Sequence, residues 1–178
     1  LALPIPGSPL TVRDFQLPGA PRHYRLGIHE GLDFYWQRGT VVTAVADGVV
    51  VRANHDFEQP TSAEILAWEQ AVQAAGTTTV EALDFYRGRQ VWLQHDNGLV
   101  SRYVHLDSIE AGVVVGTAVV QGQPIGTVGN SGSPAALSSV DADVHLHFEL
   151  WHEAQFYLGQ HLRPLEIREL LRAVLFGQ

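Results

Sequence analysis

The sequence contains no cysteine, and this absence removes two classes of site at the outset. A disulfide-stabilised scaffold is excluded, and so is any zinc site built from cysteine thiolates. Apolar runs are also short, since none approaches the ~20 residues that a membrane-spanning helix needs. We therefore expect no membrane span in these 178 residues.

Basic residues are scarce as well. The 11 Lys and Arg stand against 19 Asp and Glu, which gives a formal net charge of -8. A surface of this sign repels phosphate backbones, so we do not expect a nucleic-acid partner. The hydrophobic fraction of 46% is enough to bury a core, and this predicts one domain over residues 1–178.

The beginning of the chain lacks the pattern of a secretory signal. LALPIPGSPLTV (1–12) has no basic stretch and is interrupted by proline and glycine, so we do not interpret it as a signal peptide. Because the sequence has no initiator methionine, we expect a mature or trimmed form. Residues 1–24 are taken as an N-terminal segment of the domain.

What the sequence does contain is a series of short strand-like runs separated by glycines. VVTAVADGVVVRA (41–53) is rich in β-branched residues and is broken at Asp47-Gly48, a dipeptide that favours a hairpin turn. HLHFELW (145–151) is a further strand, and the glycines between 113 and 132 suit tight turns. We therefore predict a mainly β fold of antiparallel sheets.

A second hairpin is predicted over RQVWLQHDNGLVSRYVHL (89–106), with Asn97-Gly98 as its turn. If the loop is those two residues, Trp92 faces Tyr103 across the pair. Strand side chains alternate between faces, so Tyr103 and His105 would then lie on the same face.

Residues 55–89 interrupt this β pattern with a predicted helical insertion. Thr61-Ser-Ala-Glu64 is a capping box, and a helix from there would end at Gly76. Thr78-Thr-Val-Glu81 is interpreted as the start of a shorter helix that ends near Gly88.

A last helix is expected over residues 163–176, with Pro164 in its first turn. Its apolar face would be formed by leucines and a valine at helical spacing. These residues are Leu165, Leu170, Leu171 and Val174.

Two histidines in the strand 145–151 are the first candidates for chemistry. His145 and His147 are two residues apart, so both imidazoles point to one face while Leu146 points to the other. Two imidazoles on one face form half of a metal site, or a metal ligand beside a proton-transfer group. A pair at this spacing also arises by chance, so alone the motif decides nothing.

A second candidate is His29-Glu30-Gly31-Leu32-Asp33. The histidine and the carboxylate can converge on one ion if Gly31 lets the backbone curl between them. Zinc takes neutral imidazole nitrogen and carboxylate oxygen at about 2.0–2.2 Å. The competing interpretation is a surface loop with ordinary charges.

Together the two motifs supply two imidazoles and one carboxylate. Three protein ligands leave the fourth tetrahedral position open, which is typical of catalytic zinc and not of structural zinc. His105 and one histidine of the 145/147 pair then remain for proton transfer or oxyanion stabilisation, since imidazole has an unperturbed pKa near 6.5.

Five segments resemble those of the lysostaphin-type, LytM-like zinc metallopeptidases, and they occur in the same order. The resemblance extends from about residue 25 to 151, apart from the insertion. The segments are GIHEGLDF (27–34), DGVV (47–50), YVHL (103–106), GQPIG (122–126) and HLHFEL (145–150).

The resemblance implies a fold called the duplicated hybrid motif, which is sandwich-like, and one zinc ion. It implies His29, Asp33 and His147 as zinc ligands, His145 as the general base, and His105 as the group that bonds the developing oxyanion or helps to orient the water. The implied activity is endopeptidase action on the peptide part of bacterial peptidoglycan, at a glycine-rich bridge or a stem-peptide cross-link. A secreted, periplasmic or cell-envelope location follows.

Two departures from the family put the substrate in doubt. The insertion at 55–89 and the segment 134–143 are longer than expected, and either can wall or cover the groove. One alternative is therefore a silent or autoinhibited relative that binds wall peptide and regulates another hydrolase. Another is a non-catalytic β domain of similar architecture, which would have no reason to keep all five site residues.

We expect ordinary structural roles for several other residues. Glu149 shares strand parity with the histidines and can orient an imidazole, although an ordinary strand glutamate is the favoured interpretation. Tyr24 and Arg25 either line the groove or lie in a solvated loop. The histidines expected to be exposed or locally hydrogen-bonded are His23, His55, His95, His152 and His161.

Overall fold

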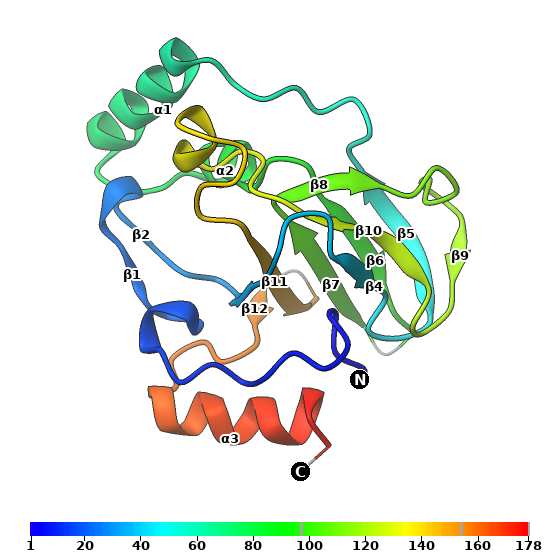
Figure 1. Cartoon of the computed structure of the whole chain (residues 1–178). Helices are drawn as coiled ribbons and strands as arrows, with labels where there is room; N and C mark the ends of the chain where they lie inside the picture. The colour runs from blue at the N-terminus through cyan, green and yellow to red at the C-terminus, as the bar shows by residue number, and fades with distance from the viewer. Residues whose placement is uncertain (97, 154, 178) are drawn as a thin grey trace.

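Antiparallel β-sheets dominate the computed structural model, which describes residues 1–96, 98–153 and 155–177 (Figure 1). The larger sheet has the order β12-β11-β7-β6-β5-β9, with β3 also paired to β11. The smaller sheet has the order β4-β10-β8, and β1 pairs with β2. The predicted fold class, mainly β with a helical insertion and a C-terminal helix, is confirmed.

The strands of the larger sheet are β3 (Leu32–Tyr35), β5 (Gly48–Ala53), β6 (Val91–Gln94), β7 (Leu99–Val104), β9 (Ala118–Val119), β11 (His145–His152) and β12 (Phe156–Tyr157). The smaller sheets contain β4 (Val41–Thr43), β8 (Leu106–Ile109), β10 (Pro124–Val128), β1 (Pro21–Arg22) and β2 (Gly27–Ile28). The helices are α1 (Ser62–Ala75), α2 (Val80–Arg87) and α3 (Pro164–Leu175), with short 3-10 turns at Asp14–Gln16, His23–Arg25 and Pro134–Leu137.

Strand β11 divides the core from the site. Its residues Leu146 and Phe148 are 0% and 2% exposed and belong to the main hydrophobic cluster. That cluster also includes Val42 of β4 and Ile125 of β10, so the core lies between the two sheets. The opposite face of β11 carries the histidines, as the alternation predicted.

The prediction of a hairpin at Asp47-Gly48 is wrong, because the strands on either side of this turn do not pair with each other. Strand β4 pairs with β10, whereas β5 pairs with β6 and β9. The chain therefore passes from one sheet to the other at this point. A turn dipeptide shows where a strand ends, but the partner of each strand is decided by packing over long distances.

The hairpin of β6 and β7 is present, but its register differs by one residue from the prediction. Trp92 faces Arg102, not Tyr103. The backbone N–H of His95 donates to the Leu99 carbonyl, so the strands are joined by a three-residue loop that ends at Gly98 with φ 78°. Loops of this length use a left-handed residue. The predicted turn residue Asn97 lies outside the described residues.

His105 does not share the face of Tyr103, contrary to the prediction. Tyr103 is fully buried in the core, whereas His105 lies among the other site histidines. The reason is a left-handed backbone at His105, with φ 61°, between β7 and β8. This conformation breaks the strand alternation and turns the imidazole to the site face.

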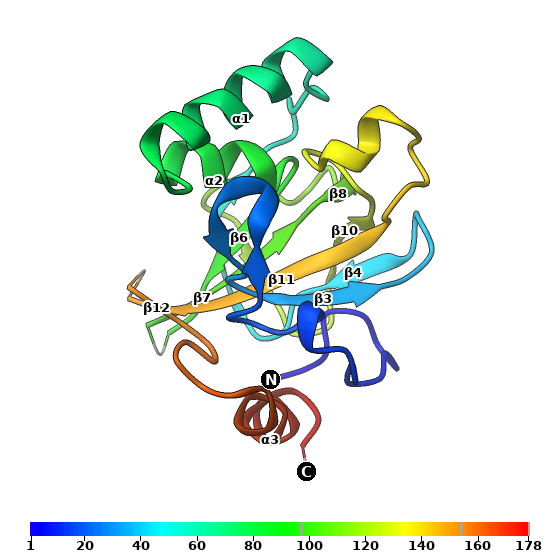
Figure 2. The ribbon, with the colours of Figure 1, turned by 90° about the vertical axis from the view of Figure 1, so that its left-hand side faces the viewer.

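The insertion forms α1 and α2, as predicted. The capping box at Thr61 and Glu64 is present, and Gly76 ends α1 in a left-handed conformation. The N-cap of α2 is Thr79, one residue later than predicted, because the Thr78 hydroxyl donates instead to the Arg25 carbonyl. Figure 2 shows both helices beside the segment that carries β1 and β2.

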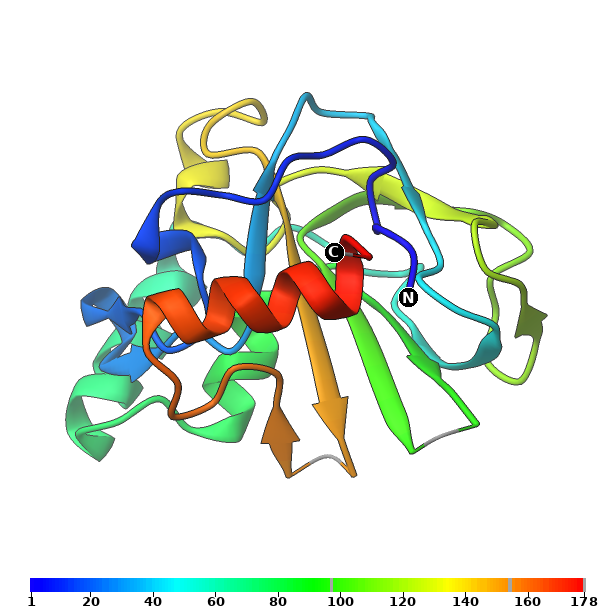
Figure 3. The same ribbon diagram turned by 90° about the horizontal axis from the view of Figure 1, so that it is seen from below.

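Helix α3 crosses below the sheets, with the N-terminal segment running beside it (Figure 3). Its buried side chains are Ile167, Leu171 and Leu175. The predicted apolar face was therefore partly wrong, since Leu165 is 65% exposed. Of the helices in the described residues, none has the length and apolar character that crossing a membrane requires.

Candidate metal centre

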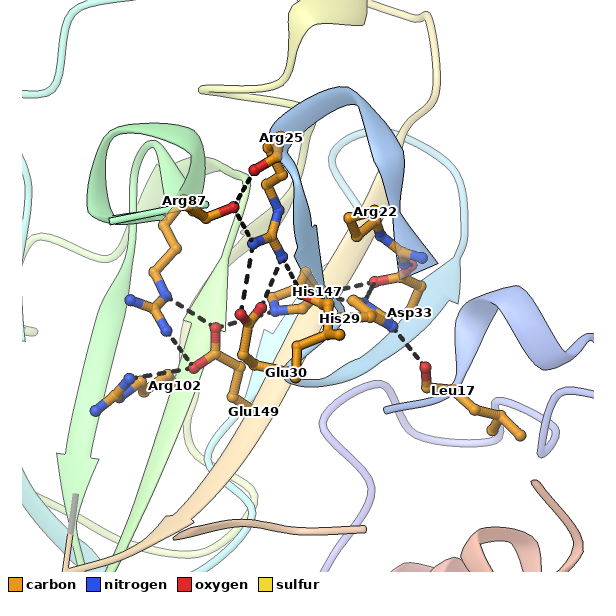
Figure 4. A network of polar contacts seen from close by, with 12 residues as sticks. Leu17, Arg22, Arg25, His29, Glu30, Asp33, Arg87, Arg102, His147 and Glu149 are labelled. Atoms are coloured by element: carbon orange, nitrogen blue, oxygen red, sulfur yellow. Dashed lines mark hydrogen bonds and ion pairs between the residues drawn. The ribbon is translucent and has the colours of Figure 1, made fainter. Parts of the chain in front are cut away.

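Three side chains from two separate parts of the chain converge on one point (Figure 4). The Nε2 atom of His29 lies 2.8 Å from Oδ1 of Asp33 and 2.8 Å from Nδ1 of His147. Asp33 Oδ1 and His147 Nδ1 are 2.9 Å apart. All three residues are buried. The predicted metal ligands are thus brought together.

Strand pairing explains this convergence. Asp33 on β3 lies directly opposite His147 on β11, so their side chains share a face. His29 reaches the same point because the chain curls at Gly31. A Cβ atom there would overlap the Phe148 carbonyl and the His147 ring, so only glycine permits this approach.

The remaining polar atom of each ligand is held by another group. The Nδ1 of His29 donates to the Leu17 carbonyl at 2.8 Å, and Nε2 of His147 donates to Glu149 Oε1 at 3.0 Å. Arg22 donates to Oδ2 of Asp33 at 3.0 Å. A neutral imidazole carries one N–H, so when both rings are neutral the two nitrogens that face each other present lone pairs.

Three electron-rich atoms within 2.9 Å of one another need a positive charge between them. Burial lowers the pKa of His147, but hydrogen bonds to Asp33 and Glu149 outweigh burial and raise the pKa to about 9. The centre therefore attracts a cation, and a divalent metal competes with the proton for it. Two imidazoles and one carboxylate, each anchored from behind, fit zinc.

His145 lies beside the three donors and is also held in one orientation. Its Nδ1 donates to the Asp143 carbonyl at 2.6 Å, and its Nε2 lies 3.8 Å from Asp33 Oδ1. The ring stacks on Tyr35, with centroids 5.0 Å apart and planes at 19°. The Nε2 lone pair of His145 therefore faces the metal centre and can accept a proton.

His105 completes the group. Its Nδ1 donates to the Ser131 carbonyl at 2.8 Å. Its ring centroid lies 4.9 Å from the ring centroid of His145 and 5.9 Å from that of His147. Burial, together with the nearby charges of His145 and His147, holds the pKa of His105 well below its usual value. His105 is therefore neutral and presents an Nε2 lone pair.

Glu149 is not an ordinary strand glutamate, contrary to the prediction. It is fully buried, and its Oε1 accepts the Nε2–H of His147. Charges from Arg87 and Arg102 compensate the carboxylate, and the Trp151 indole also donates to it. Strand parity with His147 was the available signal, but the arginine partners were not visible in the sequence.

A cavity of about 350 Å³ opens onto the donors, and both insertions contribute to its walls. Leu83 and Tyr86 come from α2, and Pro134 comes from the segment 134–143. Tyr24 and Arg25 also line it, although Arg25 is buried in an ion pair with Glu30. The segments 55–89 and 134–143 therefore form part of the cavity wall.

The N-terminal segment is part of the site. Phe15 and Arg22 line the cavity, and the Leu17 carbonyl orients His29, one of the predicted metal ligands. Backbone hydrogen bonds fix this arrangement, since His29 N donates to the Ala20 carbonyl at 2.8 Å. The segment therefore supports the metal centre.

Two histidines outside the site are hydrogen-bonded, but only the bond of His95 to Ser101 is local, as predicted, whereas the other partners are distant in sequence. His95 is buried and contacts the Asp47 carbonyl and the Ser101 hydroxyl. His55 contacts the Val113 carbonyl. His23, His152 and His161 are exposed.

Known proteins resemble this chain over the region that builds the site. Residues 27–158 match the model of Peptidase family M23. Peptidoglycan DD-endopeptidase ShyA of Vibrio cholerae is 32% identical over 127 residues, which cover 71% of this chain and 21% of that protein. ShyC of the same organism, also described as a peptidoglycan DD-endopeptidase, is 26% identical over 147 residues, covering 80% of this chain and 25% of that protein.

A solved structure shows the same fold over nearly the whole chain. Helicobacter pylori Csd3, in its hexagonal crystal, aligns with 96% of this chain and 37% of its own, at a TM-score of 0.51 and 21% identity. The chain spans less than a third of the length of the curated relatives.

Proposed function

We propose that this chain, which belongs to peptidase family M23, is a zinc-dependent endopeptidase acting on bacterial peptidoglycan. The observation that carries the proposal is the convergence of His29, Asp33 and His147, each with its second polar atom anchored. These three residues would hold the ion. The cavity that both insertions wall opens onto these three side chains, so a peptide and water can reach them.

A zinc ion held there would acidify a water molecule and polarise the scissile carbonyl. His145 would take the proton of the attacking water at Nε2, because its Nδ1–H is committed to the Asp143 carbonyl. The same group would then deliver that proton to the leaving amine. His105 is neutral and its Nδ1–H is committed to the Ser131 carbonyl, so its Nε2 would accept a hydrogen bond from the attacking water and orient it, and it holds no proton to donate to the oxyanion.

The substrate class is supported by the relatives, whose names describe peptidoglycan DD-endopeptidases. Peptide cross-links of the cell wall lie outside the cytoplasm, so we infer a secreted, periplasmic or cell-envelope location. The buried donors and the walled cavity suit a peptide that enters the cavity from solvent.

Digestion of purified peptidoglycan tests the proposal. Zinc-loaded protein should release new amino groups, and a chelator should abolish the release until zinc is restored. Mass spectra of the soluble fragments then identify the bond that is cut. A protein that binds wall peptide but releases no amino groups would instead be a silent or autoinhibited relative.

A further inference from the structure

The last residue of α2 makes a buried ion pair behind the metal centre (Figure 4). Arg87 donates from Nε to Oε1 of Glu149 and from Nη2 to Oε2, both at 2.8 Å. Arg87 is 5% exposed and Glu149 is 0% exposed. A two-point arginine–carboxylate pair fixes both the position and the plane of the carboxylate.

That carboxylate in turn holds a metal ligand. Glu149 Oε1 accepts from Arg87 and also from Nε2 of His147, the latter at 3.0 Å. The orientation of the His147 ring therefore depends on where Arg87 places the carboxylate. Partners of this kind fix the tautomer and direction of a metal-binding imidazole.

The backbone around Arg87 supports a second site histidine. The Arg87 carbonyl accepts the backbone N–H of His105 at 3.1 Å. The backbone N–H of Arg89 donates at 2.9 Å to the hydroxyl of Ser131, whose carbonyl accepts Nδ1–H of His105. His105 is thus held by hydrogen bonds that begin at the end of the insertion.

Two glycines make this junction tight. Gly88 has φ 66° and Gly132 has φ 73°. A Cβ at Gly88 would overlap the Ser131 carbonyl, and one at Gly132 would overlap the backbone of Gly88. The end of the insertion and the loop that orients His105 are therefore in direct backbone contact.

We propose that Arg87 is a positioning residue, through which the helical insertion aligns His147 for metal binding and His105 toward the attacking water. The inference rests on the proposed function, since it concerns the same metal centre. It gives the insertion a role besides walling the cavity. Loss of Arg87 should weaken zinc binding although Arg87 does not touch the ion.

The test compares two arginines, Arg87 and Arg52, each of which links helix α2 to the larger sheet through an ion pair. Arg52 makes a two-point pair with Asp84 of α2, at 2.6 and 2.8 Å, but contacts no site histidine in the described residues. Zinc affinity is measured by chelator competition on folded protein. Arg87→Met should weaken zinc binding by about 10–100-fold, as loss of such partners does, whereas Arg52→Met should leave it within about twofold.

A second pair of variants distinguishes a local effect from unfolding. It is needed because Arg87→Met leaves Glu149 with one arginine partner and can destabilise the fold. Arg87→Lys keeps the charge but loses the two-point geometry, so its zinc affinity should fall between wild type and Arg87→Met. Arg52→Lys is its control. At saturating zinc, kcat of the Arg87 variants should fall while KM stays near the wild-type value.

The outcomes separate the two proposals. Suppose that wild type binds zinc and that the Arg87 variants bind it with the same affinity as the Arg52 variants. The positioning role of Arg87 is then wrong, but the proposed metal centre is not contradicted. If wild type binds no zinc, both proposals fail. Weaker binding in the Arg87 variants alone supports the positioning role, whether or not peptidoglycan is cleaved.

Discussion

The ring of Tyr35 lies flat against the imidazole of His145, with centroids 5.0 Å apart and planes at 19°. The Tyr35 hydroxyl donates to Oδ1 of Asp143 at 2.9 Å, and the Asp143 carbonyl accepts Nδ1–H of His145 at 2.6 Å. Tyr35 and Asp143 therefore hold the imidazole from its face and from its edge. Asp143 has φ 52°, a left-handed conformation that tolerates few side chains other than Asn and Asp.

Changes at Tyr35 should affect turnover more than substrate binding. Tyr35→Phe keeps the stacked ring and loses one hydrogen bond, so kcat should fall by roughly two- to tenfold. Tyr35→Ala also removes the stacking surface, and its kcat should be lower still. Steady-state kinetics of zinc-loaded protein check both; an unchanged kcat in Tyr35→Ala would refute the role of the ring.

Substitution of the two histidines beside the candidate metal centre should have effects different from substitution of its predicted ligands. His105→Ala and His145→Ala should keep zinc, and each should lower kcat by about 10²–10⁴-fold, because the first removes the group that orients the attacking water and the second removes the group that takes its proton. His152→Ala, at an exposed position on the same strand as His145, is the control. Zinc content and turnover are measured on the same samples. Normal turnover in either site variant would remove that histidine from the mechanism.

Much of the site could be predicted because strand periodicity is local. The spacing of His145 and His147 placed both imidazoles on one face, and β11 confirms this. Gly31 allowed His29 to approach Asp33, as expected. The helix caps at Thr61 and Gly76 were predictable for the same reason, since each depends on a few neighbouring residues.

The rest depended on contacts that sequence spacing does not encode. The left-handed backbone at His105 reversed the face expected for its side chain. Strands β4 and β5 joined different sheets although only a short turn separates them. Arg87 is 62 residues away from Glu149, so the carboxylate's role could not be decided until the fold had brought them together.

Glu149 should make the stability of the metal-free protein depend on pH. Its pKa lies well below the usual value because the Arg87 charge and its bond to His147 outweigh burial. A lowered folded-state pKa stabilises the fold above the unfolded-state pKa of about 4.5, and this stabilisation is lost as pH falls through the folded-state pKa.

Glu149→Gln should therefore lower the free energy of unfolding by about 3–5 kcal/mol near neutral pH, since it leaves buried arginines unpaired. The difference from wild type should narrow as pH falls below about 4.5. Urea unfolding of both proteins at several pH values measures this difference in the free energy of unfolding. A difference that stays constant from neutral to acid pH would contradict the buried charge pair.

Glu69 on α1 should contribute to substrate choice. The arginines lining the cavity are paired, Arg22 with Asp33 and Arg25 with Glu30. Glu69 also lines the cavity, and within the described ranges it has no ion-pair partner. This carboxylate is therefore available to a cationic group on the substrate.

Glu69→Gln should lower kcat/KM for a peptide with a free amino group by about two- to fivefold, the range of a partly exposed ion pair. The N-acetylated form of the same peptide should be cleaved equally by wild type and variant. An equal loss on both peptides would show that Glu69 acts through the wall of the cavity and not through charge.

The most direct test of the metal centre is the zinc stoichiometry of wild type and ligand variants, measured by equilibrium dialysis after chelator treatment. The arrangement of His29, Asp33 and His147 predicts one zinc ion per wild-type chain and none in Asp33→Ala or His147→Ala, provided that each variant remains folded. Tight binding of one zinc ion by both folded variants would contradict the assignment.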